Sequence, residues 1–277
     1  MSEGERSELA GGRASSEAGI PPSSTPDKVL WFNEIARFLG ESYWAPGSTR
    51  VQAFTTGTAQ EVEFLVDCLD LRAGMRVLDA GCGPGRHALA LAEQGIEVVG
   101  IDASPDFIAL AQASAGPRSV EFRVGDLRDL AAEAEFDAVI CLCQGGFGLL
   151  GGHNDELDVV ARFARALRPG GRLALSAFSA YFVVRHLESG ESFDAARGVN
   201  HEIANVRGAS GEREFDLWTT CYTPRELRLL ASGARLHVDA VYAVAPGRYA
   251  RAEPSVESPE HLLIATRPGV SPAPDAL

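Results

Sequence analysis

Short apolar runs alternate with amphipathic segments through the middle of the chain. The run at 77–80 has the length of a buried strand, whereas 86–94 spaces its apolar residues as a helix does. The run at 136–143 is almost continuously apolar, which predicts a strand that is buried on both faces. Strands are predicted in this way at 77–80, 97–101, 120–124, 136–143 and 172–178, with helices at 86–94, 105–115 and 155–167. This alternation indicates an α/β fold with a parallel sheet and right-handed crossovers.

The alternation stops after residue 178 and resumes near residue 224. A helix is predicted at 224–231, followed by two closing strands at 236–244 and 261–265. The intervening segment is polar, and we expect it to form an insertion over residues 179–222. A surface hairpin that turns at 208–211 is one interpretation of this insertion, since Gly, Ala and Ser mark a turn there.

Both ends of the chain differ from its middle. Residues 1–27 are rich in Ser, Gly, Glu and Pro, so we expect a disordered leader, and a disordered tail at 268–277. Residues 28–70 carry apolar and aromatic residues at helical spacing, which predicts an N-terminal helical cap. Within it, Thr58 is the expected helix N-cap, and Glu61 would complete a capping box with it.

Composition and charge narrow the class of protein. The length of 277 residues suits one large domain or one domain with a cap, and the formal net charge of -13 disfavours a nucleic-acid substrate. No apolar run approaches the roughly 20 residues of a membrane span, and the N-terminus lacks a signal pattern. Five cysteines, an odd number, argue against a disulfide framework. We therefore expect a cytoplasmic monomer or homodimer that binds no metal, nucleic acid or membrane.

The first predicted strand runs into a glycine cluster, Val77-Leu78-Asp79-Ala80-Gly81-Cys82-Gly83-Pro84-Gly85-Arg86. A loop in this place lies at the carboxyl edge of the sheet, where open α/β folds bind ligands, and glycines let the backbone approach a ligand closely. A dinucleotide fingerprint would place a third small residue at position 86, which is Arg86. Asp79 would repel a pyrophosphate but suits a ligand with an ammonium group. A tight turn without a ligand is the alternative.

Two further acids follow the next two predicted strands. Asp102 could accept hydrogen bonds from both ribose hydroxyls of a nucleoside, or it could cap the helix that begins at Pro105. Asp126 could accept a hydrogen bond from an adenine amino group while Leu127 covers the ring, or it could be a solvated turn residue. A Pro-Gly-Gly turn at 169–171 precedes the fifth strand.

This ordered set of residues resembles the class I S-adenosylmethionine-dependent methyltransferases, over roughly residues 57–267. The resemblance implies a Rossmann-like, doubly wound sheet of seven strands with the last strand antiparallel, and a cofactor-binding domain at 71–267. It implies S-adenosyl-L-methionine as cofactor and methyl transfer to an oxygen, nitrogen or carbon of a small-molecule acceptor. The residues that we expect to bind the cofactor are Asp79, Gly81, Cys82, Gly83, Gly85, Arg86, Asp102, Ala103, Asp126, Leu127, Cys143 and Gln144.

The acceptor side of the site is less defined. The segment 141–148 lacks the Asn-Pro-Pro-Tyr type motif that holds an amide nitrogen, and Phe147 among glycines is typical of the small-molecule branch, although Phe147 could simply pack in the core. In related enzymes an insertion such as 179–222 lies over the acceptor, and we expect 28–60 to close over bound cofactor as a lid. The candidate acids and bases are His201, Glu202 and His153, because a histidine titrates near neutral pH.

Three rival functions remain open from the residues alone. The first is a protein that binds S-adenosylmethionine without methyl transfer, such as a cyclase or a binding module. The second is an NAD-type oxidoreductase, which Asp79 and the glycine spacing disfavour. The third is an RNA methyltransferase, which the acidic charge disfavours.

Overall fold

The structure is a computed structural model, and it describes residues 31–43, 57–142, 147–149, 153–208 and 211–269. The predicted leader, almost all of the predicted tail and part of the predicted cap lie outside the described residues. No helix among the described residues is both long and apolar enough to cross a membrane.

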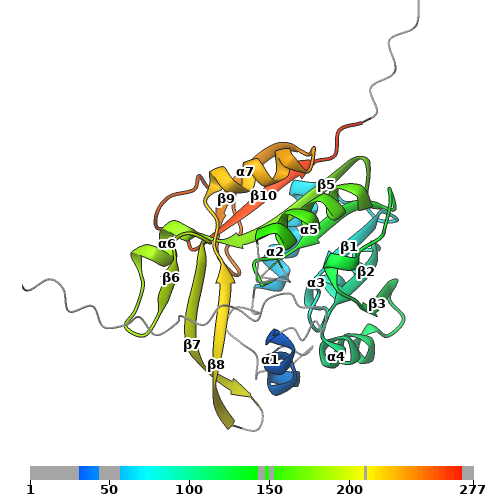
Figure 1. Ribbon diagram of the computed structural model, residues 1–277. Coiled ribbons are helices and arrows are strands. Elements are labelled where there is room, and N and C mark those ends of the chain that lie inside the picture. The colour runs from blue at the N-terminus through cyan, green and yellow to red at the C-terminus, as the bar shows by residue number, and fades with distance from the viewer. Residues whose placement is uncertain (1–30, 44–56, 143–146, 150–152, 209–210, 270–277) are drawn as a thin grey trace, which may run out of the picture.

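A seven-stranded sheet forms the centre of the molecule (Figure 1). Its strand order is β3-β2-β1-β4-β5-β10-β9, and β10 alone runs antiparallel to both of its neighbours. The strands are β1 (Arg76–Ala80), β2 (Glu97–Asp102), β3 (Val120–Val124), β4 (Phe136–Cys141), β5 (Leu167–Phe178), β9 (His237–Val244) and β10 (Glu260–Thr266). The predicted seven-stranded fold with an antiparallel last strand is confirmed.

Helices cover both faces of the sheet. Alternate residues of β1 show this, because Val77 joins a core cluster with α2 (Thr58–Leu69), α3 (Arg86–Ala92) and α4 (Pro105–Ala115), whereas Leu78 joins one with α5 (His153–Ala166) and α7 (Pro224–Gly233). Side chains of successive strand residues point to opposite faces. Burial on both faces therefore explains why the central strands are almost continuously apolar.

Most predicted strands and helices end within two residues of the observed bounds, but β5 does not begin where predicted. It begins at Leu167, five residues before the expected start, because Leu167 already pairs with Phe136 of β4. The register then shifts, and Gly170 takes a φ of 83° within the strand. The predicted Pro-Gly-Gly turn is thus an irregularity inside β5.

The insertion folds as a short helix, α6 (Ala180–Arg185), and a second sheet of three antiparallel strands. These are β6 (Ser192–Asp194), β7 (Val199–Gly208) and β8 (Gly211–Thr220). The β7–β8 hairpin projects well beyond the main sheet (Figure 1) and is paired as far as Gly208 and Gly211, as the hairpin interpretation predicted.

Helix α1 (Trp31–Leu39) lies between this hairpin and α4 (Figure 1). The Phe38 ring packs against Phe215 of β8 with 5.3 Å between ring centroids, and Arg37 forms an exposed ion pair with Asp106 of α4. Gly208 is needed at this contact, since a Cβ there would lie 2.6 Å from the Phe38 carbonyl oxygen. The amphipathic helix that the apolar spacing predicts is confirmed.

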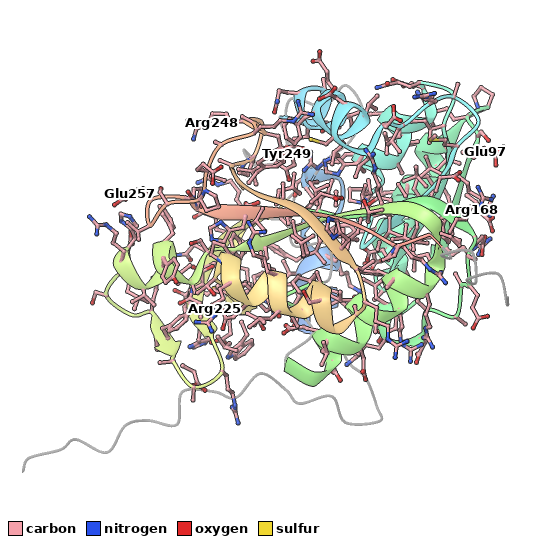
Figure 2. All side chains as sticks on the ribbon, turned by 90° about the horizontal axis from the view of Figure 1, so that it is seen from above. Glu97, Arg168, Arg225, Arg248, Tyr249 and Glu257 are labelled. Carbon is pink, nitrogen blue, oxygen red and sulfur yellow. The ribbon has the colours of Figure 1, made fainter. Side chains whose placement is uncertain are left out.

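The direction of the strands fixes where a ligand can bind. Figure 2 shows Glu97 and Arg168, near the starts of β2 and β5, at one end of the sheet and Glu257, just before β10, at the other. Because β10 is antiparallel, its first residue lies at the carboxyl edge of its neighbours: Glu260 pairs with Phe178, the last residue of β5. The hairpin and α1 face this same edge.

Candidate functional site

A cavity of about 420 Å³ lies at the carboxyl edge of the main sheet, within the size range of ligand pockets. The sheet loops line one wall, through Gly81, Cys82, Gly83, Arg86, Asp102, Ala103, Asp126 and Leu127. The hairpin lines a second wall through Glu202, Ala204, Val206, Leu217 and Thr219, and α1 lines a third through Phe32, Ile35, Ala36 and Leu39. The spacing of these α1 residues places them on one face of the helix.

The glycines of the loop after β1 have different structural roles. Gly81, Gly83 and Gly85 take φ values of 72°, 54° and 86°, in the left-handed region that favours glycine. A Cβ on Gly83 would meet no atom closer than 3.9 Å, so this glycine keeps the backbone open to the cavity. A Cβ on Gly85 would lie 2.7 Å from the Phe122 ring, so Gly85 serves packing, and it does not line the cavity.

Asp102 is held in place by backbone donors on both sides. Its Oδ2 accepts from the Gly83 N–H and its Oδ1 from the Ser104 N–H, each at 2.8 Å. Burial raises the pKa of Asp102, while these two hydrogen bonds oppose the rise. The alternative role as helix N-cap is wrong, because the Ser104 hydroxyl caps α4. Each carboxylate oxygen keeps a further lone pair, and Asp102 lines the cavity.

Asp126 also lines the cavity, but a neighbour that sequence reasoning missed holds its carboxylate. The Arg128 guanidinium donates to Asp126 at 3.0 Å through Nε and at 2.7 Å through Nη2. Arg128 also reaches Asp155 at 3.3 Å. The adenine role of Asp126 stays a prediction, and any ligand there shares the carboxylate with Arg128.

Asp79 lies beneath the glycine loop. It is 2% exposed and does not line the cavity, so the structure does not bring it to the position where a ligand ammonium was expected. Burial raises the pKa of Asp79 to about 7, although the Arg86 charge lowers it. A direct contact between Asp79 and a ligand has no support in this placement.

A buried carboxylate, Glu61, joins three parts of the chain near the loop. It accepts from Arg86 Nη1 at 2.5 Å, pairs with His87 Nε2 at 2.8 Å, and accepts from the Gly247 N–H at 2.8 Å. Burial alone would raise the pKa of Glu61, but the His87 hydrogen bond and the Arg86 charge lower it to about 2. The predicted capping box is therefore wrong: Gly57 is the N-cap of α2, and Glu61 makes tertiary contacts instead.

The residue before Glu61 strengthens the same junction. The Gln60 side chain donates to the Tyr249 carbonyl at 2.7 Å and accepts from the Tyr249 N–H at 2.8 Å. Figure 2 shows Tyr249, with Arg248, in the connection between β9 and β10. The first turn of α2 thus holds this connection close to the start of α3.

His201, a candidate base, points away from the cavity. Successive residues of β7 face opposite sides, and Glu202 lines the cavity whereas His201 does not. The His201 ring stacks on Trp218 with 5.0 Å between centroids and pairs with Asp216 at 2.7 Å. Burial and the neighbouring Glu191 raise the pKa of Glu202. Of this pair, Glu202 is the residue that the structure brings to the site.

The remaining expectations fall on the loop around residue 147. Cys143 and Gln144 lie outside the described residues, and His153 is the first residue of α5, with its side chain outside the description. Phe147 is buried and stacks on Tyr222 with 5.0 Å between ring centroids. It does not line the cavity, so its alternative role in core packing is the observed one.

Sequence reasoning missed Glu260, the first residue of β10. It is 5% exposed and lines the cavity. Burial, with the nearby charge of Glu61, raises the pKa of Glu260 to about 7. The signal was the antiparallel last strand, since only that direction places its first residue, Glu260, at the carboxyl edge of the sheet.

Comparisons with known proteins agree on one kind of chemistry. A sequence profile described as a methyltransferase domain matches residues 77–171. The chain is 31% identical to the cypemycin N-terminal methyltransferase of a Streptomyces species over 210 residues, which are 70% of this chain and 84% of that protein. It is 40% identical to a ubiquinone biosynthesis O-methyltransferase of Xanthomonas oryzae, but it spans only 44% of that protein's length.

Solved structures extend the likeness over most of the chain. The CcbJ methyltransferase from Streptomyces caelestis has a TM-score of 0.67 at 21% identity, covering 87% of this chain and 97% of that one. CalS10 from Micromonospora echinaspora, an amino pentose methyltransferase solved with bound S-adenosylmethionine, has a TM-score of 0.56 at 25% identity. That match covers 79% of this chain and 93% of CalS10.

The Glu61 junction generates a stability prediction. Glu61→Gln should lower the free energy of unfolding at pH 7 by about 3 kcal/mol, because it leaves the buried Arg86 charge without its partner. The pKa of Glu61 falls from 4.5 to about 2 on folding, so its contribution is present above pH 4.5 and is lost as the pH falls toward 2. Urea unfolding at pH 7 and pH 3 measures this, with the exposed Glu63→Gln as control. Equal stability of the two variants at pH 7 would contradict the account.

Asp102 generates a binding prediction. Asp102→Ala should weaken S-adenosylmethionine binding by at least about 1.5 kcal/mol, because a charged acceptor of ligand hydrogen bonds is lost. Isothermal titration calorimetry measures the affinity. Glu97→Ala, at the opposite end of the same strand, is the control and should bind as the unmodified protein does. Unchanged affinity of Asp102→Ala would remove the ribose assignment.

Proposed function

Since the chain belongs to the S-adenosylmethionine-dependent methyltransferases, we propose that it methylates the nitrogen of an amine, carried by a small molecule or by a peptide. This family membership removes the NAD-type oxidoreductase from the rival functions. The observation that carries the proposal is the pair of carboxyl groups, Glu202 and Glu260, which line the cavity from the hairpin and from the sheet.

The residues at the ends of β1, β2 and β3 fit the cofactor. Gly83 leaves the loop open to the cavity, and Asp102 presents a carboxylate that the loop itself orients. A nucleoside ribose offers two hydroxyl donors to such an acceptor. We propose that the cofactor lies along Gly81, Cys82, Gly83, Asp102, Ala103, Asp126 and Leu127. When bound, it supplies a methyl group activated by a sulfonium sulfur.

The charge of the cavity favours a cationic acceptor. Arg86 is the only arginine or lysine among the described lining residues, and its charge is paired with Glu61. His87 is neutral, because burial lowers its pKa to about 4. Glu202 and Glu260 therefore face the acceptor without a free cation among the described residues of the cavity. A protonated amine is attracted to such a site, whereas a carboxylate or phenolate is repelled.

Apolar side chains complete the acceptor half. Leu142 and Phe178, at the ends of β4 and β5, face the same cavity as Leu217 of the hairpin and Phe32 of α1. These side chains exclude water from the reacting atoms and provide surface for an apolar acceptor body. Two of the similar proteins have names that mention an N-terminus or an amino sugar, the cypemycin N-terminal methyltransferase and the amino pentose methyltransferase CalS10, and these names support an amine acceptor.

Methylation of a hydroxyl is the second candidate. The likeness to ubiquinone biosynthesis O-methyltransferases favours it, but that match covers only 39% of this chain. The cavity carboxyls argue for nitrogen, because a hydroxyl that has lost its proton is an oxyanion, and the negative charges of Glu202 and Glu260 would oppose its presence beside them.

A product assay tests the proposed function. With methyl-labelled S-adenosylmethionine, the protein should methylate an amino sugar or a short peptide with a free N-terminus, and should leave the N-acetylated peptide and a catechol unchanged. Mass spectrometry locates the added methyl group. Labelling of the catechol alone would replace the amine with the hydroxyl acceptor.

Matched variants of neighbouring hairpin residues sharpen that assay. Glu202→Gln should raise KM for the amine about tenfold, because one ionic contact with the ammonium is lost. His201→Ala should keep KM near the original value, since its side chain faces away from the cavity. Loss of activity in His201→Ala with normal Glu202→Gln would reverse the assignment.

A further inference from the structure

Glu260 is a buried acid that no partner satisfies. It is 5% exposed, and no described residue donates a hydrogen bond to its carboxyl group or forms an ion pair with it. The Arg86 guanidinium acts on it through its charge but is already bound to Glu61. Its oxygens are not among the fully buried side-chain atoms that lack a partner, so they open on the cavity, where a donor on a ligand could reach them.

The topology places Glu260 on the acceptor half of the cavity. The loops after β1, β2 and β3 supply Gly83, Asp102 and Asp126 on the proposed cofactor half. The ends of β5 and β10 supply Phe178 and Glu260, and these two residues pair directly with each other in the sheet. Glu260 therefore lies on the side of the sheet away from the β2 and β3 ends.

The position of Glu260 is also rigid. Its backbone is fixed between Phe178 of β5 and Val244 of β9, and the preceding Pro259 carbonyl accepts from the Ser179 N–H at 3.0 Å. Glu202, by contrast, stands on the hairpin, and its pKa is tied to the nearby Glu191 and Glu188. A side chain that accepts a proton from a positioned substrate needs a fixed geometry, and a strand inside the main sheet provides this better than a projecting hairpin does.

We propose that Glu260 is a catalytic residue that takes the proton from the ammonium of the acceptor, while Glu202 holds the acceptor's positive charge. The inference rests on the proposed amine methylation. The proton passes from nitrogen to a Glu260 oxygen, which frees the nitrogen lone pair. That lone pair forms the N–C bond, the C–S bond breaks, and its electron pair stays on sulfur. The products are a methylated ammonium and S-adenosylhomocysteine, and the Glu260 proton returns to solvent after product release.

The electrostatic surroundings suit this task. Burial and Glu61 raise the pKa of Glu260 to about 7, whereas Arg86 lowers it, so the group exchanges a proton near neutral pH. On its own strand, His261 faces the other way and is neutral, since burial lowers its pKa to about 4. The residues paired beside Glu260 are the uncharged Phe178 and Val244. From the helices packed against this edge, Glu61 of α2 and Arg86 of α3 are the charged groups that act on Glu260. The other titratable side chains among the described cavity residues are Tyr43, Cys82, His87, Asp102, Asp126 and Glu202.

The pH dependence of methylation tests the inference. The probe is a short peptide with a free N-terminal amine, whose own pKa is about 8. For the unmodified protein, kcat/KM should fall below about pH 7, where Glu260 becomes protonated. For Glu260→Gln, kcat/KM at pH 7 should fall at least ~100-fold and should recover partly above pH 8, where the peptide amine loses its proton without help.

Two controls separate this role from others. The affinity of Glu260→Gln for S-adenosylmethionine, measured by calorimetry, should stay within about twofold of the original, because Glu260 lies on the acceptor half of the cavity. A tenfold loss of affinity would correspond to about 1.4 kcal/mol. Glu257→Gln, an exposed glutamate in the same connection, should keep the original pH profile. A large loss of cofactor affinity in Glu260→Gln would show that Glu260 pairs with the cofactor and would overturn the proposal.

Thermal stability gives a readout without activity. The pKa of Glu260 rises from 4.5 to about 7 on folding, so its ionisation penalises the folded state as pH rises from 4.5 through 7. Glu260→Gln should therefore melt a few °C higher at pH 8.5 and at the same temperature at pH 4.5. If no amine is methylated by the unmodified protein, the proposed function fails, and this inference with it. If amines are methylated and the Glu260→Gln pH profile is unchanged, only this inference fails.

Discussion

A single buried carboxylate, Glu61, determines how the cofactor side of this protein is assembled. It binds Arg86 and His87 at the start of α3 and the Gly247 N–H in the β9–β10 connection. Removing any of these partners leaves a buried charge or donor unpaired, so the three segments are held as one unit. The same ion pair compensates the positive charge of Arg86. Glu202 and Glu260 line the cavity, whereas Arg86, the arginine among its described lining residues, is paired with Glu61. The proposed preference for a cationic acceptor follows from that pairing.

The second constraint is the exposed carboxyl edge of the sheet. The strands present Asp102, Phe178 and Glu260 at this edge, where water would otherwise compete for every charge. The β7–β8 hairpin and α1 close the space above it, with Phe38 and Phe215 packed against each other between them. Each wall thus contributes different side chains: the sheet contributes Asp102 and Glu260 at fixed positions, the hairpin contributes Glu202, and α1 contributes apolar side chains.

The sequence predicts the sheet and the glycine loop well, because each depends on local pattern and on strand order. It also singles out Asp102, which the structure places in the wall of the cavity. It misjudges Glu61, since a Thr-x-x-Glu pattern has the same letters whether the glutamate caps its helix or reaches another segment. It offers both His201 and Glu202 as candidate acids and bases, because the pattern does not say which face of a hairpin meets the core. Glu260 could have been predicted from the antiparallel direction of the last strand, but only once the ligand-binding edge of the sheet had been assigned.

The position of an amine inside the cavity tests the central claim most directly. A crystal structure with S-adenosylhomocysteine and a short alkylammonium ion would locate the nitrogen. The account predicts the nitrogen within about 3 Å of a carboxyl oxygen of Glu260 or Glu202, in line with the cofactor sulfur. The cofactor should lie over Gly83, with its ribose on Asp102. An alkylammonium found at Asp126, or a cofactor that occupies the Glu260 carboxyl itself, would contradict the account.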